Sequence, residues 1–441
     1  MSLDRREFLK VAGLQAGVLV AGSRPAPAHA PAVHTRPAPD VCVIGAGAFG
    51  IWTALNLRRL GATVTVIDQH GPGNSRATSG GETRGVRSSY GERTTWVRWV
   101  NEAIRRWLAW DEEWRGRVNL RLFFQTGDLI LRANLEDPWL SATIESWDGL
   151  GTPYDVLTMD EAQYRYPQVN MDGLGVAVVE RNAGVVRARR ACEAVSEVFR
   201  GEGGEMVIAR AALGRIDGAR MLDAALDGAG AFSAGQYVFA CGPWLSKVLP
   251  VMRNRLRIPM GHVFYYGPPP GDNRFTYPNM PSYNVPGVTG WPALPPDFRG
   301  FRVRTGGRAP QDPDESVRYI EPQYLERPRR FLAERFPALK DAPLLETRAC
   351  HYESSVDRNF IVDRHPGLDN VWIAGGGSAE GFKFGPVIGE YIARRVVGAE
   401  TDPALADEFR LKDEEFDPPV ADDDGEEVGT PKVGAASRKK P

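Results

Sequence analysis

Cysteine and histidine are scarce in this chain, which has four cysteines and six histidines among 441 residues. The cysteines lie far apart in the sequence, and none belongs to a C-x-x-C pair: Cys42, Cys192, Cys241 and Cys350. Structural zinc sites and disulfide frameworks need closely and regularly spaced ligands or cysteine pairs. The sequence therefore predicts no metal centre and no disulfide-stabilised fold.

An excess of charge of either sign is also missing. The 54 basic and 56 acidic residues leave a net charge of −2, so no general attraction to nucleic acid or to an anionic membrane is expected. The weakly apolar run at residues 11–23 is shorter than the roughly 20 residues of a membrane span. The length is sufficient for two or three structural units with a large core.

The first 30 residues have the parts of an export signal. Arg5 and Arg6 precede the apolar run, and Ala28-His29-Ala30 supplies a cleavage site of small residues. We therefore expect a twin-arginine signal peptide over residues 1–30, a linker over 31–39, and export by the twin-arginine machinery to the periplasm or outside the cell. The alternative is a disordered N-terminus with a chance arginine pair.

The strongest motif follows an apolar strand at residues 41–44. Three glycines in the spacing G-x-G-x-x-G lead into a helical pattern: Gly45, Gly47 and Gly50. The first permits a tight turn, the second lets the backbone approach a pyrophosphate, and the third lets helix and strand pack closely. A second strand, residues 62–67, ends in Asp68, which can accept a hydrogen bond from a ribose hydroxyl. The pattern predicts dinucleotide binding; the alternative is a plain βαβ unit.

Later segments predict a discontinuous α/β nucleotide domain and a second domain. Strands followed by glycines recur at residues 236–244 and 370–377, whereas residues 255–345 alternate short β-like runs with Pro-Gly turns. A hairpin is expected over residues 121–131, turning at Gly127 and Asp128. Helices are expected over residues 95–114, 191–200, 328–336 and 387–397.

A long glycine-rich segment, residues 71–91, contains Arg84 and Arg87. A loop of this length inside a domain is usually functional or disordered. Its arginines suit either solvated surface charges or a loop that binds a flavin and a carboxylate.

These pieces together resemble the monomeric sarcosine oxidase and N-methyltryptophan oxidase family, within the D-amino-acid-oxidase-like flavoproteins. Three blocks carry the resemblance: Val43 to Gly50 with Asp68; Gly81 to Arg87 with Tyr90-Gly91; and Cys350-His351-Tyr352 through Asp357, Phe360 to Asp363 and His365-Pro366 to Gly381-Phe382-Lys383-Phe384. The resemblance implies a Rossmann-like FAD-binding domain, discontinuous over residues 40–90, 180–250 and 346–400. It also implies an α+β substrate domain over residues 91–179 and 251–345, built on an antiparallel sheet. A disordered tail is expected over residues 413–441.

The same resemblance implies roles for individual residues. Cys350 matches the cysteine that holds the flavin through a thioether; by itself it would be interpreted as a small buried hydrophobe. Arg87 and Lys383 match the cations that bind a substrate carboxylate, and Arg84 matches an arginine near the flavin ring. The predicted cofactor-binding residues are Gly45, Gly47, Gly50, Asp68, Thr83, Arg84, Gly242, Trp244, Cys350, Gly376, Gly377, Gly381, Phe382 and Lys383.

The chain departs from the family pattern at several positions. A lysine that activates dioxygen in the family corresponds to Arg302, which is also a cation but does not deprotonate. A histidine before Gly-Phe-Lys-Phe is replaced by Glu380, and two histidines of the arginine loop by Ser79 and Gly80. Glu380 could favour a substrate with a second positive charge, or it could be exposed to solvent.

The expected activity is FAD-dependent oxidation of the C–N bond of an amino acid or N-alkyl amino acid. Hydride passes to the flavin, the imine product hydrolyses, and dioxygen yields hydrogen peroxide. The predicted catalytic residues are Arg84, Arg87, Arg302 and Lys383. The alternatives are a dehydrogenase that passes electrons to a quinone or carrier protein, a non-catalytic flavin-binding partner protein, and a nicotinamide enzyme.

Overall fold

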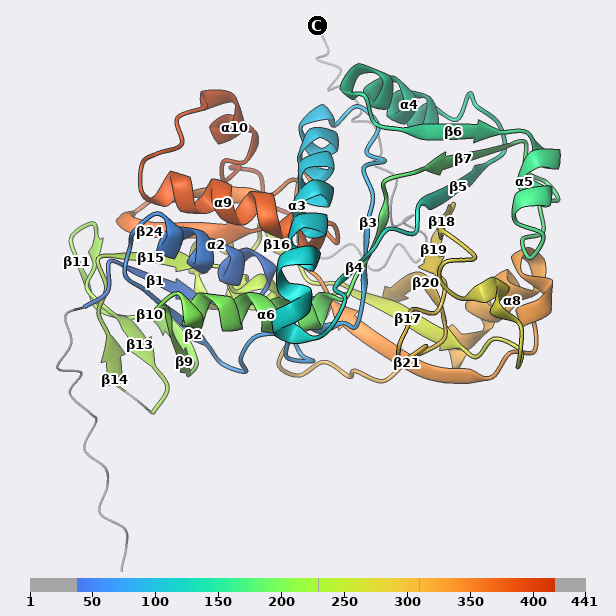
Figure 1. Cartoon of the computed structure of the whole chain (residues 1–441). Helices are drawn as coiled ribbons and strands as arrows, with labels where there is room; N and C mark the ends of the chain where they lie inside the picture. Colours follow the sequence, from blue (N-terminus) through green and yellow to red (C-terminus); the bar gives the residue numbers. More distant parts are fainter. Residues whose placement is uncertain (1–37, 229, 309, 417–441) are drawn as a thin grey trace, which may run out of the picture. The chain divides into compact units, whose positions relative to one another are not determined.

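A six-stranded sheet forms the centre of the nucleotide-binding half of the chain (Figure 1). The structure, a computed structural model, describes residues 38–416 except 229 and 309. Five strands of the sheet run parallel, and β23 pairs antiparallel with β24 at one edge. In sheet order the strands are β23 (Ile361–His365), β24 (Leu368–Gly375), β15 (Gln236–Phe239), β1 (Val41–Ile44), β2 (Val64–Asp68) and β9 (Glu205–Ile208).

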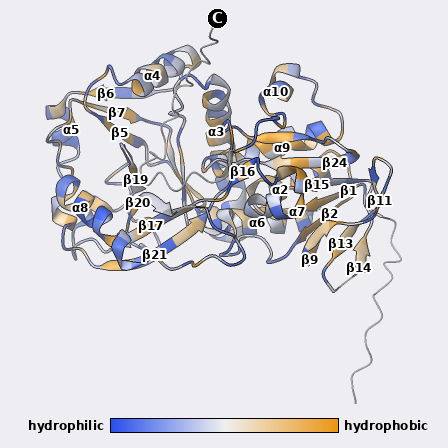
Figure 2. Cartoon of the chain, turned by 180° about the vertical axis from the view of Figure 1, so that it is seen from behind, coloured by the Kyte–Doolittle hydropathy of each residue, from blue (hydrophilic) through white to orange (hydrophobic). Residues whose placement is uncertain are grey.

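Helix α2 (Ala48–Arg59) follows the glycine loop and contacts α6 (Ala188–Gly201) and α9 (Gly385–Val396). Trp52 of α2 is fully buried. A Cβ at Gly385 or Gly389 would lie 2.7 Å or 2.4 Å from atoms of Trp52, so these glycines allow α9 to pack closely on α2. Figure 2 shows α9 as largely hydrophobic, in agreement with its burial.

A second sheet has eight strands and is antiparallel except where β18 runs parallel to β5. Its strands, in sheet order, are β21 (Leu344–His351), β17 (Met260–Tyr266), β20 (Phe301–Arg308), β19 (Val288–Trp291), β18 (Ser282–Val285), β5 (Asp128–Arg132), β7 (Val176–Glu180) and β6 (Tyr154–Leu157). The predicted fold class, a Rossmann-like α/β unit with a second unit on an antiparallel sheet, is confirmed. The predicted domain boundaries stay predictions, although β21 runs across the one expected at residues 345–346.

The long helix α3 (Thr94–Val118) lies between the two large sheets in both views (Figures 1 and 2). Trp110 of this helix stacks on Trp52, with ring centroids 3.4 Å apart. The prediction for α3 ended four residues too early, and α6, α9 and α8 (Glu326–Arg335) begin two or three residues before their predicted starts. The other α-helices that the described residues form are α4 (Pro138–Leu150), α5 (Met159–Arg165), α7 (Leu245–Val248), α8 (Glu326–Arg335) and α10 (Pro403–Glu408).

The hairpin predicted over residues 121–131 is wrong. Strand β4 (Phe123–Phe124) pairs with β8 (Gly184–Val186) in a three-stranded sheet with β3 (Arg84–Val86), whereas β5 pairs with β7 and β18. Gly127, at φ +72°, donates its N–H to the carbonyl of Ala183, so the chain passes from one sheet to the other instead of reversing. The remaining short strands are β10 (Ala211–Leu213), β11 (Ile216–Asp217), β12 (Arg220–Met221), β13 (Ala224–Leu226), β14 (Gly230–Phe232), β16 (Leu256–Arg257) and β22 (Ser354–Ser355).

The predicted signal peptide and most of the linker lie outside the described residues. Of the tail predicted from residue 413, the structure describes residues 413–416, where Phe416 donates its N–H to the carbonyl of Asn254 and its ring lies 4.3 Å from the Arg257 guanidinium. The rest of that tail also lies outside the described residues. Within the described part of the chain, none of the helices has the length and apolar character needed to cross a membrane.

Candidate active site

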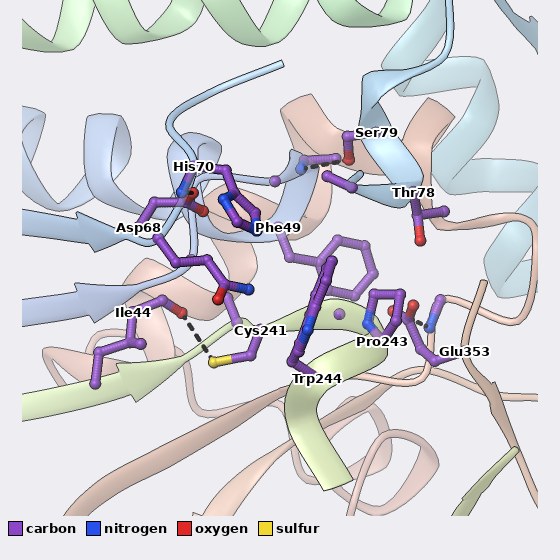
Figure 3. A pocket seen from close by; sticks show the side chains of 18 of the residues that line it. Ile44, Phe49, Asp68, His70, Thr78, Ser79, Cys241, Pro243, Trp244 and Glu353 are labelled. Carbon is purple, nitrogen blue, oxygen red and sulfur yellow. Dashed lines mark hydrogen bonds between the residues drawn. The ribbon is translucent and has the colours of Figure 1, made fainter. Parts of the chain in front are cut away.

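A cavity opens at the carboxyl ends of four parallel strands, where open α/β sheets bind their ligands (Figure 3). The loop after β1, the end of β2, the turn after β15 and the loop after β24 all contribute to its lining. Nine of the predicted cofactor-binding residues lie here: Gly45, Gly47, Asp68, Arg84, Gly242, Trp244, Gly377, Gly381 and Phe382. We call this the nucleotide cavity.

The glycine loop fits a dinucleotide at the start of α2. A Cβ at Gly45 would lie 2.3 Å from the carbonyl oxygen of Ala240, and one at Gly50 would lie 1.9 Å from that of Gly45. Both positions therefore require glycine for packing. Gly47 is different, because a Cβ at this position would have only Ser79 Oγ nearby, at 3.4 Å. The backbone at Gly47 therefore stays open to the cavity that it lines. A pyrophosphate can approach the backbone and the helix N-terminus there.

Asp68 is held in place by backbone N–H groups. Its Oδ2 accepts from Ala46 at 2.7 Å, and its Oδ1 accepts from His70 at 2.8 Å and Gly71 at 2.7 Å. These bonds aim the carboxylate at the glycine loop, where it can still accept from a ribose hydroxyl through its remaining lone pairs.

Glu353 in the nucleotide cavity was missed by sequence reasoning. It is 8% exposed, and its Oε1 accepts from the N–H of Gly377 at 3.2 Å. Burial raises the pKa of this carboxyl. A lone acidic residue outside any motif gives no pattern, so no signal in the sequence identified it.

A second cavity adjoins the first, and we call it the reaction cavity. Five residues line both: Thr78, Arg84, Tyr352, Ala379 and Phe382. One wall is a face of the eight-stranded sheet, to which β17, β19, β20 and β21 contribute side chains. The structure brings Arg84, Arg87, Arg302, Cys350 and Lys383 together here.

Three predicted cofactor-binding residues line neither cavity. Gly50 packs α2 against the strand loop, and Gly376, at φ +67°, makes a turn after β24. Thr83 lies behind the reaction cavity, where its hydroxyl accepts from Trp291 Nε1 at 3.1 Å. Each acts on the shape of the site rather than by facing it.

Cys350 of β21 lines the reaction cavity, and its Sγ lies 3.6 Å from Nη2 of Arg84, which lines both cavities. Burial by itself raises the pKa of this thiol, but the guanidinium groups of Arg84, Arg348 and Arg318 lower it below its usual value. Burial instead raises the pKa of Cys192 to about 12 and raises those of Cys42 and Cys241. Among the four cysteines, Cys350 alone has the electropositive surroundings of a reactive thiol.

Glu380 lies inside the reaction cavity and not in solvent, with 16% of its side chain exposed. Its carboxylate contacts the Lys383 ammonium, lies 3.6 Å from Arg87 Nη2, and accepts from the hydroxyl of Tyr90 at 2.7 Å. Burial would raise its pKa, but Lys383 and Arg87 lower it well below its usual range. Burial lowers the pKa of Lys383 to about 8, although Glu380 opposes that shift.

Two buried carboxyl groups lie beyond Arg87, on neighbouring positions of β5 and β7. Asp128 and Glu180 are 2% and 0% exposed. Burial, followed by the charge of Asp128, raises the pKa of Glu180 to about 8. Glu180 accepts hydrogen bonds from Ser88 N at 2.8 Å and Ser88 Oγ at 2.7 Å. Sequence reasoning missed this pair because only the register of the sheet brings the two residues together.

Comparisons with known proteins agree with this geometry. The chain is 26% identical to monomeric sarcosine oxidase from Arthrobacter sp., over 82% of this chain and 93% of that protein. It is 25% identical to human peroxisomal sarcosine oxidase, over 80% of this chain and 90% of that protein. It is 24% identical to N-methyl-L-tryptophan oxidase from Escherichia coli, over 84% of this chain and 98% of that protein.

Solved structures share the fold. L-proline dehydrogenase from P. horikoshii superposes with a TM-score of 0.72 at 20% identity, over 84% of this chain and 96% of that one. Glycine oxidase from Bacillus cereus superposes with a TM-score of 0.71 at 17% identity, over 86% of this chain and 100% of that one. The FAD dependent oxidoreductase family matches residues 40–395. The chain belongs to that family, and FAD is its cofactor.

Proposed function

We propose that this protein oxidises the C–N bond of an amino acid or N-alkyl amino acid, in the manner of the sarcosine and N-methyltryptophan oxidases that it resembles. The observation that carries the proposal is the reaction cavity itself. It adjoins the nucleotide cavity at Arg84, Phe382 and Tyr352, and it combines buried cations with a cysteine whose pKa is lowered by neighbouring arginines.

The chain's residues position FAD and substrate. The glycine loop and Asp68 would hold the adenosine and pyrophosphate half, and Arg84 and Cys350 would hold the isoalloxazine half. When bound, that ring supplies the redox chemistry by accepting a hydride from the carbon beside the substrate nitrogen. Phe382, Tyr352 and Trp291 give the cavity apolar and aromatic walls, which exclude water and favour a neutral, reactive amine.

Cations set the electrostatics of the cavity. Arg84 donates to the carbonyls of Thr78 and Thr83, so its guanidinium is fixed at the junction of the cavities, where it can stabilise negative charge on the ring. The family resemblance assigns Arg87 and Lys383 to a substrate carboxylate. That role stays a prediction, and both cations already face Glu380.

A covalent link between Cys350 and FAD is part of the proposal. The lowered pKa of the thiol and its contact with Arg84, which lines both cavities, support it. Export by the twin-arginine route is also proposed, from the sequence of residues 1–30 alone. Replacing Arg5 and Arg6 with lysine should leave the precursor in the cytoplasm, as cell fractionation would show.

The test of the activity is to mix the flavin-loaded protein with N-methyl amino acids without oxygen and to follow the flavin absorbance. Bleaching by a substrate, followed by stoichiometric peroxide when air is admitted, is the expected result. Bleaching without peroxide, with turnover restored by a quinone or artificial acceptor, would instead identify a dehydrogenase. A flavin that no amine bleaches would contradict the proposal and favour a non-catalytic binding protein.

A further inference from the structure

Two arginines in the reaction cavity lie beyond ion-pair distance of every carboxylate that the structure describes. Arg302 and Arg304 occupy alternate positions on β20, so their side chains leave the same face of the sheet and line the cavity. In the part of the chain that the structure describes, neither guanidinium donates a hydrogen bond or lies within ion-pair distance of a carboxylate. Arg302 is 2% exposed, and its Nε and Nη1 are buried without a partner.

Burying such groups is costly, which indicates a ligand. Burial lowers the pKa of Arg302 to about 9 and lowers that of Arg304, and an unpaired buried donor carries its full desolvation cost. The Arg302 guanidinium lies over the Trp291 ring, with its Cζ 3.7 Å from the ring centroid. That stacking orients the group but satisfies none of its N–H donors, so they remain available to an anion.

The other cations of the cavity differ, because Arg87 and Lys383 already share a carboxylate. Glu380 contacts Lys383 and lies 3.6 Å from Arg87, and Tyr90 donates to the same carboxylate. A substrate carboxylate would have to displace Glu380 and leave it as a buried charge without a partner, which is strongly unfavourable. An anion that enters the cavity therefore binds more favourably to Arg302 and Arg304 of β20 than to Arg87 and Lys383.

We propose that Glu380 is an internal carboxylate that occupies the Arg87–Lys383 pair, and that Arg302 and Arg304 bind the carboxylate of the substrate instead. This inference rests on the proposed function and specifies its substrate site. Glu380 is then a specificity-determining residue.

The surroundings of the two arginines suit a carboxylate next to the flavin. Cζ of Arg304 lies 6.0 Å from the ring centroid of Tyr352, which lines both cavities. Thr289 of β19 lies opposite Arg304 in the sheet and also lines the cavity. Guanidinium groups bind carboxylates through paired N–H donors, so a substrate held here has its reacting carbon close to the boundary of the nucleotide cavity.

The test measures binding of butyrate, an unreactive carboxylate, to the flavin-loaded protein through the shift of the flavin absorption spectrum. Arg304→Gln should weaken butyrate binding about 10- to 100-fold, and Arg304→Lys should restore part of it. Arg299→Gln is the matched control. It removes the same charge three residues before Arg302, but that guanidinium pairs with Glu82 and Glu346 and does not line the reaction cavity, so butyrate binding should change less than threefold.

Two further variants test the role of Glu380. Lys383→Gln should change butyrate binding little, whereas Glu380→Gln should tighten it by freeing Arg87 and Lys383. If Glu380→Gln is unstable, Glu380→Ala replaces it, and acetate should raise the melting temperature of that variant more than that of the parent.

Loss of butyrate binding in Lys383→Gln with normal binding in Arg304→Gln would overturn the proposal, as would absence of butyrate binding to the parent. If neither Glu380→Gln nor Glu380→Ala binds the carboxylate probe more tightly than the parent does, the proposed role of Glu380 is wrong. Butyrate binding needs no turnover. A protein whose flavin no amine reduces would therefore refute the proposed function without changing these results.

Discussion

The carboxylate of Glu380 pairs with the ammonium of Lys383, three residues further along the chain, and both side chains are buried at 16% and 5% exposure. The one-turn helix from Gly381 to Phe384 begins directly after Glu380 and brings the two together. The pair closes the end of the reaction cavity that the family resemblance assigns to a substrate carboxylate. We therefore propose that this short segment helps to select the substrate.

Cys350→Ser should abolish covalent attachment of FAD, because the serine hydroxyl does not ionise as the thiol does. Mass spectrometry of acid-precipitated protein is the measurement, with flavin mass expected on the Cys350 peptide of the parent only. Cys192→Ser is the matched control, since that thiol is buried with its pKa raised to about 12. Flavin that remains attached to Cys350→Ser would contradict the assignment.

Gly50→Ala should destabilise the fold and prevent FAD binding. The new Cβ would lie 1.9 Å from the carbonyl of Gly45, and overpacking against backbone costs about 1–3 kcal/mol or more. Gly47→Ala should fold and bind FAD more weakly, because its Cβ faces the cavity. Gly149→Ala, in α4 with nothing within 4 Å, is the control. Thermal unfolding and flavin content separate the three outcomes, and equal behaviour of Gly50→Ala and Gly47→Ala would be contrary to expectation.

Glu180→Gln should make stability less dependent on pH. The folded state raises the pKa of this carboxyl from its usual 4.5 to about 8, so the native state holds a proton that the unfolded chain has released. Stability from this group is present below about pH 4.5 and is lost as the pH rises to 8. Each pKa unit corresponds to about 1.4 kcal/mol.

Melting temperatures at pH 6 and pH 8.5 check this expectation. The parent should lose more stability than Glu180→Gln over that interval. Glu161→Gln is the control, because the exposed Glu161 caps α5 and its lowered pKa places its titration at acid pH. A slope unchanged by Glu180→Gln would show that the carboxyl is ionised in the native protein.

Arg302→Gln should slow reoxidation of the reduced enzyme by dioxygen by about tenfold or more, because a buried cation stabilises the negative charge that forms on oxygen. Anaerobic reduction by substrate, at saturating concentration, should change much less. Stopped-flow absorbance under the two conditions separates the steps. If reoxidation is unchanged while an artificial acceptor still supports turnover, the dehydrogenase alternative gains support.

The glycine fingerprint, the strand before it and the acid after the second strand could all be read in order along the chain. Their chemistry depends on local spacing, so the nucleotide half of the fold followed from Gly45, Gly47, Gly50 and Asp68. Cys350 and Lys383 were found through a family pattern of the same local kind. The hairpin at Gly127 was wrong because the same pattern of apolar residues suits two strands that join different sheets.

The sequence by itself determined the fold class, the cofactor family and most of the residues at the cavities, because these depend on spacing along the chain. Tertiary structure alone decided the charge balance of the reaction cavity. It placed Glu380 between Lys383 and Arg87 and paired Asp128 with Glu180. It also left Arg302 and Arg304 beyond ion-pair distance of the described carboxylates. Coulombic energies depend on the distances between charged groups, and desolvation energies depend on how deeply each group is buried. Both are set by elements far apart in the sequence, so spacing along the chain does not encode them.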